Sequence, residues 1–245
     1  MFPVKPNDTA LYNYSAHAGI ATQAHVAGLP QNTSAGIKKN IFISLAPVYD
    51  LTRFFDIIIS AACLIVFLPI FLLIAFIIKI SSKGPIIFSQ KRVGKHNRDF
   101  TLYKFRTMRV DDNDPGSLMT SGHSHRVTRV GHFLRKYKLD ELPQLYNVLK
   151  NEMSIVGPRP ELRKYVDLYS NFDREILLIK PGITDYASIL FRNENKLLAL
   201  QANPEKHYIE TVVPVKIRLN RKYANNKTLK NYLIIIVKTI VSLFN

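Results

Sequence analysis

Cysteine is almost absent from this sequence, with Cys63 as the one residue of its type among 245. A lone cysteine excludes an intrachain disulfide, so nothing points to an oxidising compartment and a cytosolic catalytic part is expected. Acidic residues are also scarce, because 18 Asp and Glu stand against 34 Lys and Arg and leave a net charge of +16. This excess predicts an anionic partner: a nucleic acid, an anionic lipid surface or a phosphorylated substrate.

The N-terminal region lacks both apolar periodicity and the charged-then-apolar order of a secretory signal. We therefore expect residues 1–45 to form a disordered leader. The length of 245 residues suits one domain with a sizeable core plus appendages, and it does not demand two domains.

One long hydrophobic run is present, over residues 57–80, interrupted by Ser60, Pro69 and Lys79. As a straight helix this run would be about 36 Å long, enough to cross a hydrocarbon core of roughly 30 Å. A spanning helix is therefore one interpretation. Pro69 removes a backbone hydrogen bond and costs about 3 kcal/mol inside a helix, so we expect a kink there.

Basic residues lie on both sides of this run, namely Lys38, Lys39, Arg53, Lys79, Lys83, Lys91, Arg92, Lys95 and Arg98. Such residues mark the cytoplasmic side of a membrane, and a hairpin that turns at Pro69 would leave both flanks there. The sequence thus favours a re-entrant membrane helix over residues 46–82. A kinked spanning helix stays open as the alternative. The same charges would be attracted to anionic inner-membrane lipid.

The part expected to be cytosolic, residues 83–245, begins with a predicted β-hairpin. Residues 86–89 and 99–105 have strand character, and turn residues lie between them. A loop that we interpret as a mobile flap follows over residues 109–125. It contains His123 and His125, but no further ligand at metal spacing, so we assign no zinc site.

Two helices are predicted between residues 127 and 153 from apolar residues at helical spacing, and Asp140 and Glu141 lie between them. A purely structural interpretation is available. Asp140 would be the N-cap of the second helix, Glu141 would favour the helix dipole, and Pro143 would fit the first turn.

The surrounding charges favour a functional interpretation. Basic residues precede the acidic pair at Arg126, Arg129, Arg135, Lys136 and Lys138, and Arg159 follows between two prolines. Guanidinium groups beside a helix N-terminus match phosphate oxygens. Adjacent carboxylates in such a setting suit Mg²⁺, which binds a few carboxylates together with substrate phosphates. These are the components of phosphoryl transfer.

Short blocks in a fixed order then identify a resemblance that covers roughly residues 50–240. The blocks occupy residues 54–56, 82–85, 90–94, 104–108, 134–135, 139–144, 147–149, 153–160 and 181–184. Together they closely resemble the bacterial sugar transferases, the monotopic polyprenyl-phosphate phosphoglycosyl transferases. Any one block alone would be weak, but their number and order make the resemblance specific.

The resemblance implies an α+β, mainly helical fold with a re-entrant membrane helix broken at Pro69. It also implies a Mg²⁺-dependent enzyme on the cytosolic face of the bacterial inner membrane. A UDP-sugar would be the donor and undecaprenyl or another polyprenyl phosphate the acceptor, with release of UMP. Such a reaction initiates surface polysaccharide or glycoconjugate synthesis, and downstream glycosyltransferases are possible partners.

The same resemblance assigns roles to individual residues. Asp140 would be the nucleophile and Glu141 its metal-binding neighbour, and the metal ligands would be this pair. Phosphate or substrate contacts are expected from Lys104, Arg106, Arg135 and Arg159.

Four positions depart from the family pattern. Leu68 precedes the proline where Ser is frequent, so a hydroxyl that could satisfy freed carbonyls is lost. Lys138 stands where a small hydroxyl residue is common. Asp185 and Tyr186 replace the usual Gly and aromatic residue at a place where donor contacts are plausible, which leaves the identity of the sugar open.

The C-terminal third carries fewer signals. We predict a helix over residues 171–179, a short strand over 187–191, and an interfacial or core helix over 232–244, which is too short to span.

Two rival functions compete with the enzyme interpretation. A membrane-tethered nucleic-acid-binding protein would explain the charge, but no nucleic-acid-binding module is recognisable, so we expect no nucleic acid partner. A catalytically inactive membrane scaffold is disfavoured by the intact acidic pair and the Pro-Arg-Pro segment.

Overall fold

The computed structural model describes residues 46–109 and 126–244, and helices predominate in this part of the chain. The helices are α2 (Ala46–Val66), α3 (Leu68–Ser81), α4 (Arg129–Lys136), α5 (Gln144–Leu149), α6 (Arg163–Val166), α7 (Tyr186–Leu190), α8 (Glu194–Ala199), α9 (Pro204–His207), α10 (Val213–Asn225) and α11 (Leu229–Phe244). Short 3₁₀ turns are η1 (Lys95–Asn97), η3 (Leu139–Glu141) and η4 (Asp173–Leu178), and η5 (Tyr208–Val212) is a π-helix. The strands are β1 (Ile87–Val93), β2 (Asp99–Phe105), β3 (Ser154–Val156) and β4 (Gly182–Thr184). The mainly helical α+β fold is thereby confirmed.

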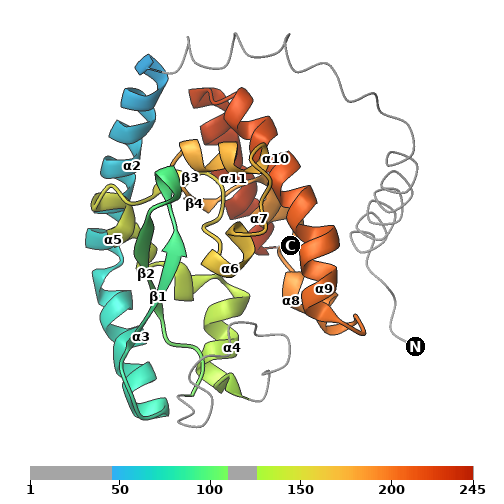
Figure 1. Cartoon of the computed structure of the whole chain (residues 1–245). Helices are drawn as coiled ribbons and strands as arrows, with labels where there is room; N and C mark the ends of the chain where they lie inside the picture. Colours follow the sequence, from blue (N-terminus) through green and yellow to red (C-terminus); the bar gives the residue numbers. More distant parts are fainter. Residues whose placement is uncertain (1–45, 110–125, 245) are drawn as a thin grey trace, which may run out of the picture.

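The hydrophobic run forms two helices that meet at a sharp bend. Helix α2 ends at Val66, α3 begins at Leu68, and their axes differ by 62°. Pro69 lies in the first turn of α3, where its missing N–H costs little. The expected break is confirmed, but the two arms do not fold back alongside each other as a tight hairpin (Figure 1). Among the described helices none alone has the length and hydropathy of a membrane span, whereas this bent pair has them jointly.

Polar side chains fasten α2 to the rest of the protein. Asp56 is 2% exposed and accepts hydrogen bonds from Ser154 Oγ, Ile155 N and Tyr232 Oη at 3.1, 2.8 and 2.8 Å. Arg53 donates to the carbonyl oxygens of Val148 and Leu149 at the end of α5. Arg53 is therefore occupied within the fold rather than directed at lipid headgroups.

Two small sheets carry the segments on which the helices pack. β1 and β2 form the predicted antiparallel hairpin, in which Ile87 pairs with Phe105 and Val93 with Asp99. β1 extends four residues beyond the predicted strand end at residue 89, since it continues to Val93. β3 and β4 form a short parallel pair that the sequence did not predict.

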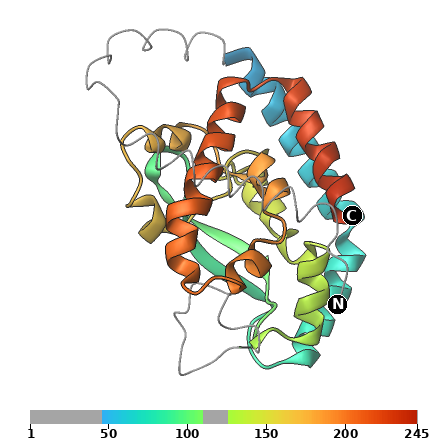
Figure 2. The same cartoon turned by 90° about the vertical axis from the view of Figure 1, so that its right-hand side faces the viewer.

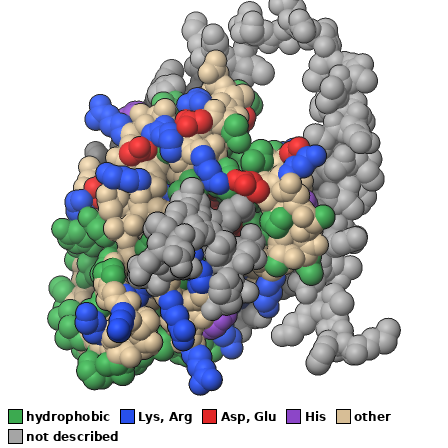
Figure 3. All heavy atoms as spheres, turned by 60° about the horizontal axis from the view of Figure 1, so that its bottom comes forward, with side chains coloured by type: hydrophobic (Ala, Val, Ile, Leu, Met, Phe, Trp, Pro, Cys, Tyr) green, Lys and Arg blue, Asp and Glu red, His purple; other side chains and the backbone are tan. Residues whose placement is uncertain are grey.

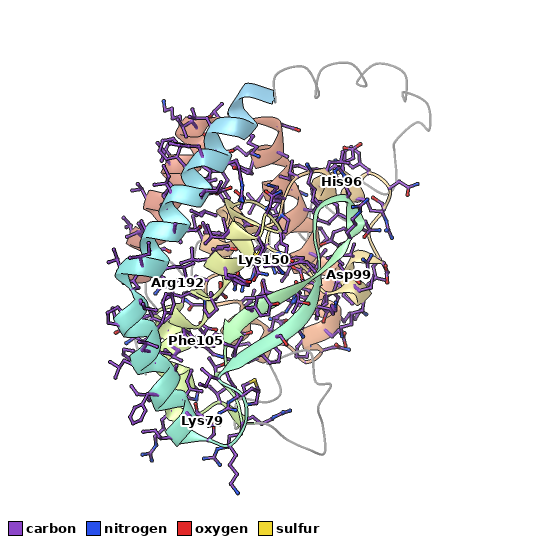
Figure 4. All side chains as sticks on the ribbon, turned by 90° about the vertical axis from the view of Figure 1, so that its left-hand side faces the viewer. Lys79, His96, Asp99, Phe105, Lys150 and Arg192 are labelled. Atoms are coloured by element: carbon purple, nitrogen blue, oxygen red, sulfur yellow. The ribbon has the colours of Figure 1, made fainter. Side chains whose placement is uncertain are left out.

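Two hydrophobic clusters connect these sheets to the helices. The larger one joins β2, α5, β3, α10 and α11 through Phe100, Leu102, Val148, Met153, Ile155, Val156, Ile179, Tyr223, Tyr232 and Ile235. A second cluster joins α3, β2 and α4 through Ile74, Ile78, Phe105 and Leu134. Figure 4 shows Phe105 beside α3, with Lys79 near the lower end of that helix and His96 at the far end of the hairpin. The second arm of the bent pair thus packs with β2 and α4 in one scaffold.

The outer faces of α2, α3 and α11 are apolar. Figure 2 shows α11 running beside α2, and the exposed residues include Ile65, Leu72, Phe76, Val237 and Val241, each at least half exposed. Hydrophobic side chains gather at the lower left of the space-filling view, next to Lys and Arg side chains (Figure 3). An exposed apolar surface of this extent marks a site of contact with lipid or protein.

Three other expectations can be compared with the fold. Residues 187–191 do not form a strand: they lie almost entirely in α7, because Asp185 caps that helix by accepting from the Ser188 amide. The helix expected over residues 232–244 is confirmed as part of α11, and residues 171–179 contain η4. The predicted leader (residues 1–45) and residues 110–125 of the predicted flap, with His123 and His125, lie outside the described residues.

Asp56→Ala should strongly destabilise the protein. The substitution leaves buried donors on Ser154, Ile155 and Tyr232 without their acceptor, and each such loss costs about 1–3 kcal/mol. We expect the free energy of unfolding in detergent to fall by roughly 3 kcal/mol or more. Asp99→Ala is the matched control, because it breaks an exposed pair with Arg163 that is worth about 0–1 kcal/mol. Equal losses for the two variants would contradict the anchoring role of Asp56.

Candidate active site

Asp140 and Glu141 lie on η3, the single 3₁₀ turn between α4 and α5. The turn follows Lys138, which has a left-handed backbone with a φ of 57° and redirects the chain at the end of α4. Both acidic side chains are buried, at 8% and 7% exposure. Two adjacent buried carboxylates are costly unless charges or hydrogen bonds compensate them.

The expectation that Asp140 is an N-cap is wrong. Pro143 occupies the N-cap position of α5, which has no side-chain cap. A cap at Asp140 would have to accept from the amide of Leu142 or of residue 143. The Leu142 amide already bonds to the Leu139 carbonyl, and a proline has no amide hydrogen. The purely structural interpretation of Asp140 therefore fails, because the N-cap hydrogen bond that it requires has no available donor.

Glu141 is compensated by two cations. Arg159 pairs with it in a fork, with Nη1 donating to Oε2 at 2.9 Å and Nη2 donating to Oε1. Lys104 on β2 donates to Oε1 at 3.3 Å. Burial would raise the pKa of Glu141, but Arg159 and Lys104 hold it well below its usual value. Glu141 is therefore a fixed anion.

Asp140 differs from its neighbour. Its Oδ1 atom is buried and has no hydrogen-bond partner within the described residues. Burial raises the pKa of Asp140, and the charge of Glu141 raises it further. Lys104, Lys138 and Arg135 act in the opposite direction. The site thus contains the ion-paired carboxylate of Glu141 and the Oδ1 atom of Asp140, which is available for a ligand or for chemistry.

Cations from separate elements surround the pair. Burial lowers the pKa of Lys104 to about 8, although Glu141 opposes the shift. Arg135, in the last turn of α4, donates from Nε to Thr107 Oγ1 at 2.9 Å and is close enough to Asp140 for its pKa to respond to that carboxylate. The structure therefore brings Lys104, Arg135 and Arg159 together around the acidic pair.

Arg159 reaches the site from the loop after β3. Gly157 and Gly182 approach so closely that a Cβ on either would collide with the opposite backbone, and Gly182 N bonds to Pro158 O at 2.9 Å. The buried Asp185 accepts from Arg159 N at 3.2 Å. Asp185 thus holds the backbone of the arginine loop and caps α7.

The predicted phosphate ligand Arg106 is not brought into this cluster. Its guanidinium donates to the carbonyl oxygens of Ile78 and Ser82 and to Ser82 Oγ, between 2.8 and 3.4 Å. Arg106 therefore ties the C-terminal end of α3 to β2.

The donor set suits a hard divalent cation that shares its shell with substrate. No group of three or more His, Cys, Asp or Glu side chains gathers at metal spacing in residues 46–109 and 126–244. Mg²⁺ needs only one or two carboxylates if phosphates complete its shell. The unpartnered Asp140 Oδ1 and the remaining lone pairs of Glu141 meet that requirement.

Comparison with known proteins decides the family. The sequence profile named "Bacterial sugar transferase" matches residues 48–245. The chain belongs to the bacterial sugar transferase family. Members of this family that resemble it include an Aeromonas hydrophila protein named UDP-N-acetylgalactosamine-undecaprenyl-phosphate N-acetylgalactosaminephosphotransferase, 43% identical over 59% of this chain and 35% of the relative.

Two further relatives carry the name UDP-glucose:undecaprenyl-phosphate glucose-1-phosphate transferase. The Klebsiella pneumoniae protein is 44% identical over 56% of this chain and 30% of its own length. The Escherichia coli K12 protein is 39% identical over 60% of this chain and 34% of its own length. The bacterial sugar transferase described here thus matches about a third of the length of these relatives.

Several residues that organise the site were missed by the sequence reasoning. Asp56 was visible as the one acid next to an otherwise apolar run, which signals a buried polar contact. Tyr208 and Lys216 are assigned no role from the sequence, yet both contact Glu161 beside the arginine loop.

The pKa of Lys104 offers a direct test of this geometry. Its ammonium should be charged below pH 8 and neutral above it, and Glu141→Gln should lower its pKa further by removing the opposing anion. Competitive labelling with an amine-reactive reagent across pH, followed by mass spectrometry, measures this pKa. The exposed Lys150, whose partner is Glu152, is the internal control and should not respond. An unchanged Lys104 titration in Glu141→Gln would contradict the pairing.

Proposed function

We propose that this protein transfers a sugar-1-phosphate from a UDP-sugar to undecaprenyl phosphate, or another polyprenyl phosphate, and releases UMP. The observation that carries the proposal is the buried, unpartnered Oδ1 of Asp140 among Lys104, Arg135 and Arg159. The names of the relatives, which specify UDP-sugars and undecaprenyl phosphate, support the substrate classes.

The proposed reaction has two displacements at one phosphorus atom. Asp140 Oδ1 attacks the phosphorus nearest the sugar, a P–O bond forms, and the bond to UMP breaks so that UMP leaves with the electron pair. The product is an acyl phosphate on Asp140. An oxygen of the polyprenyl phosphate then attacks the same phosphorus, and the Asp140 carboxylate leaves. The lipid receives the sugar-phosphate, and the enzyme is regenerated.

The neighbouring residues divide the remaining tasks. Arg159 and Lys104 neutralise Glu141 and present positive charge to the phosphates, and Arg135 lies on the Asp140 side of the cluster. Charge that is fixed before the reaction stabilises the developing negative charge without reorganisation. Mg²⁺, held by Asp140, Glu141 and substrate phosphates, would supply further neutralisation when bound.

The bent pair α2–α3 supports a location at the bacterial inner membrane, with the catalytic part on the cytosolic face. Its apolar outer surface would contact lipid, and the packing of α3 against β2 and α4 places that surface on the scaffold of the site. A soluble donor and a lipid acceptor could then reach Asp140 in turn. The product would start a surface polysaccharide or glycoconjugate that downstream glycosyltransferases extend.

Exchange of labelled UMP into the UDP-sugar pool, with no acceptor present, tests the covalent route. The wild-type enzyme should catalyse this exchange with the correct donor, and Asp140→Asn should abolish it because the nearly isosteric amide cannot form an acyl phosphate. Asp99→Asn is the control for an acidic residue distant from the site. Exchange in Asp140→Asn, or UMP release that requires lipid phosphate, would favour direct transfer instead.

Turnover should require a divalent cation. EDTA should abolish activity and added Mg²⁺ should restore it, since the acidic pair and the donor phosphates otherwise repel each other. Titration of Mg²⁺ in a UMP-release assay measures the requirement, and Glu141→Gln should raise the Mg²⁺ concentration needed. Full activity in EDTA would remove the metal from the proposal.

Both ends of the bent pair should face the cytosol. Single cysteines at Leu51 and Lys83, in a Cys63→Ala background, should both be protected from an impermeant thiol reagent added outside intact cells and labelled after lysis. Labelling of one position from outside would instead indicate a broken spanning helix.

A further inference from the structure

A second buried polar cluster lies directly behind the arginine loop. Its centre is Glu161, two residues after Arg159, which accepts from Tyr208 Oη at 2.6 Å and from Lys216 Nζ at 3.4 Å. Lys216 also pairs with Glu194 at 2.6 Å. Tyr208 and Lys216 are 4% and 8% exposed, so the contacts are shielded from water. The mechanism proposed above does not use this cluster.

The π-helix η5 explains how Tyr208 and Lys216 reach the same carboxylate. Residues eight apart in a regular α-helix point about 80° away from each other, at roughly 3.6 residues per turn. Here Val213 N donates to Tyr208 O, an i to i+5 hydrogen bond that places one extra residue in the turn. Tyr208 and Lys216 therefore point in directions expected for residues seven apart, which differ by about 20° around the helix axis. Accordingly, Lys216 Nζ lies 3.1 Å from Tyr208 Oη.

The charges of the cluster are stable in this environment. Burial would lower the pKa of Lys216, but Glu161 and Glu194 raise it above its ordinary value. Burial would likewise raise the pKa of Glu161, whereas Lys216 and the Tyr208 hydroxyl lower it. Glu161 is therefore a permanent anion with fixed partners.

The connection from Glu161 to Arg159 is short and stiff. Pro160 separates the two residues and Pro158 precedes them, so the backbone has few alternative conformations. The same segment is bonded to β1: Val93 N donates to Glu161 O at 3.0 Å, and Arg92 Nη1 donates to Pro160 O at 3.3 Å. A displacement of Glu161 would therefore move the guanidinium that pairs with Glu141.

We propose that Tyr208 and Lys216 are positioning residues that hold Glu161 and, through the Arg159-Pro160-Glu161 segment, fix the Arg159 guanidinium on Glu141. The single π-turn of η5 is the structural device that allows both to do so. The structural claim stands on the contacts alone, and its effect on turnover rests on the proposed function.

Nuclear magnetic resonance of arginine side chains tests the structural claim without an activity assay. In protein with ¹⁵N-labelled arginine, the guanidinium signal of Arg159 is assigned from its loss in Arg159→Lys. Tyr208→Phe and Lys216→Met should each speed the exchange of the Arg159 guanidinium protons with water. Tyr165→Phe is the matched control, because its ring packs 4.9 Å from that of Tyr208 while its hydroxyl contacts Glu205. Unchanged exchange in both cluster variants would overturn the proposal.

A double-mutant cycle on donor-dependent UMP release tests the consequence for turnover. Tyr208→Phe should lower kcat between roughly tenfold and a hundredfold, as small misplacements of a positioned group do. The same substitution in an Arg159→Met background should cost little more, since it acts through Arg159. Tyr165→Phe should retain activity. Fully additive losses would overturn the positioning role. If the wild-type enzyme releases no UMP, the proposed function is refuted, and the exchange of the Arg159 guanidinium protons alone decides whether Tyr208 and Lys216 position Arg159.

Discussion

The ion pair between the buried Glu141 and the half-buried Arg159 is the interaction on which the arrangement of the site depends. It connects η3 to the loop after β3. Removing Arg159 would leave the buried Glu141 carboxylate with the 3.3 Å contact from Lys104, a loss that costs at most about 3–5 kcal/mol. The pair also separates the two carboxylates in function: Glu141 is neutralised, and Asp140 retains an oxygen without a hydrogen bond in the described part of the chain. Adjacent residues of the same chemistry therefore acquire different tasks from their surroundings alone.

The helices with apolar outer faces and the site share one scaffold. Asp56 fastens α2 to β3 and α11, and the larger hydrophobic cluster continues from these elements to β2, which carries Lys104. Arg106 ties the end of α3 to the same strand. Under the proposed function, a lipid acceptor bound along the apolar face of α2 and α3 would lie on the same scaffold as the cations of the site.

The sequence predicted the features that depend on local pattern. Hydrophobic periodicity and turn residues indicated the β-hairpin and the helices, Pro69 indicated the break, and the short blocks indicated the family, the acidic pair and its basic neighbours. Features that depend on contacts between distant segments could not be predicted from the sequence. The three-residue strands β3 and β4 are defined by pairing with each other rather than by their own alternation.

Individual residues illustrate why pattern alone fails at such points. Asp140 has the spacing of an N-cap, but Pro143 provides no amide for it. Arg106 lies in the block that carries Lys104, but it follows Phe105, the last residue of β2, and its guanidinium turns to the C-terminal end of α3. Tyr208 and Lys216 fall on one face only because η5 is a π-helix, whereas a periodicity of 3.6 residues would separate them.

In the proposed mechanism Asp140 Oδ1 is the reactive atom of the site. This can be tested by peptide mapping after acid quench of the enzyme incubated with Mg²⁺ and a UDP-sugar labelled in the phosphate nearest the sugar, without lipid acceptor. We expect one labelled peptide that contains Asp140, whose label is released by hydroxylamine as expected for an acyl phosphate and is lost when polyprenyl phosphate is added before the quench. A stable label on another residue, or no protein-bound label under conditions in which UMP is released, would contradict it.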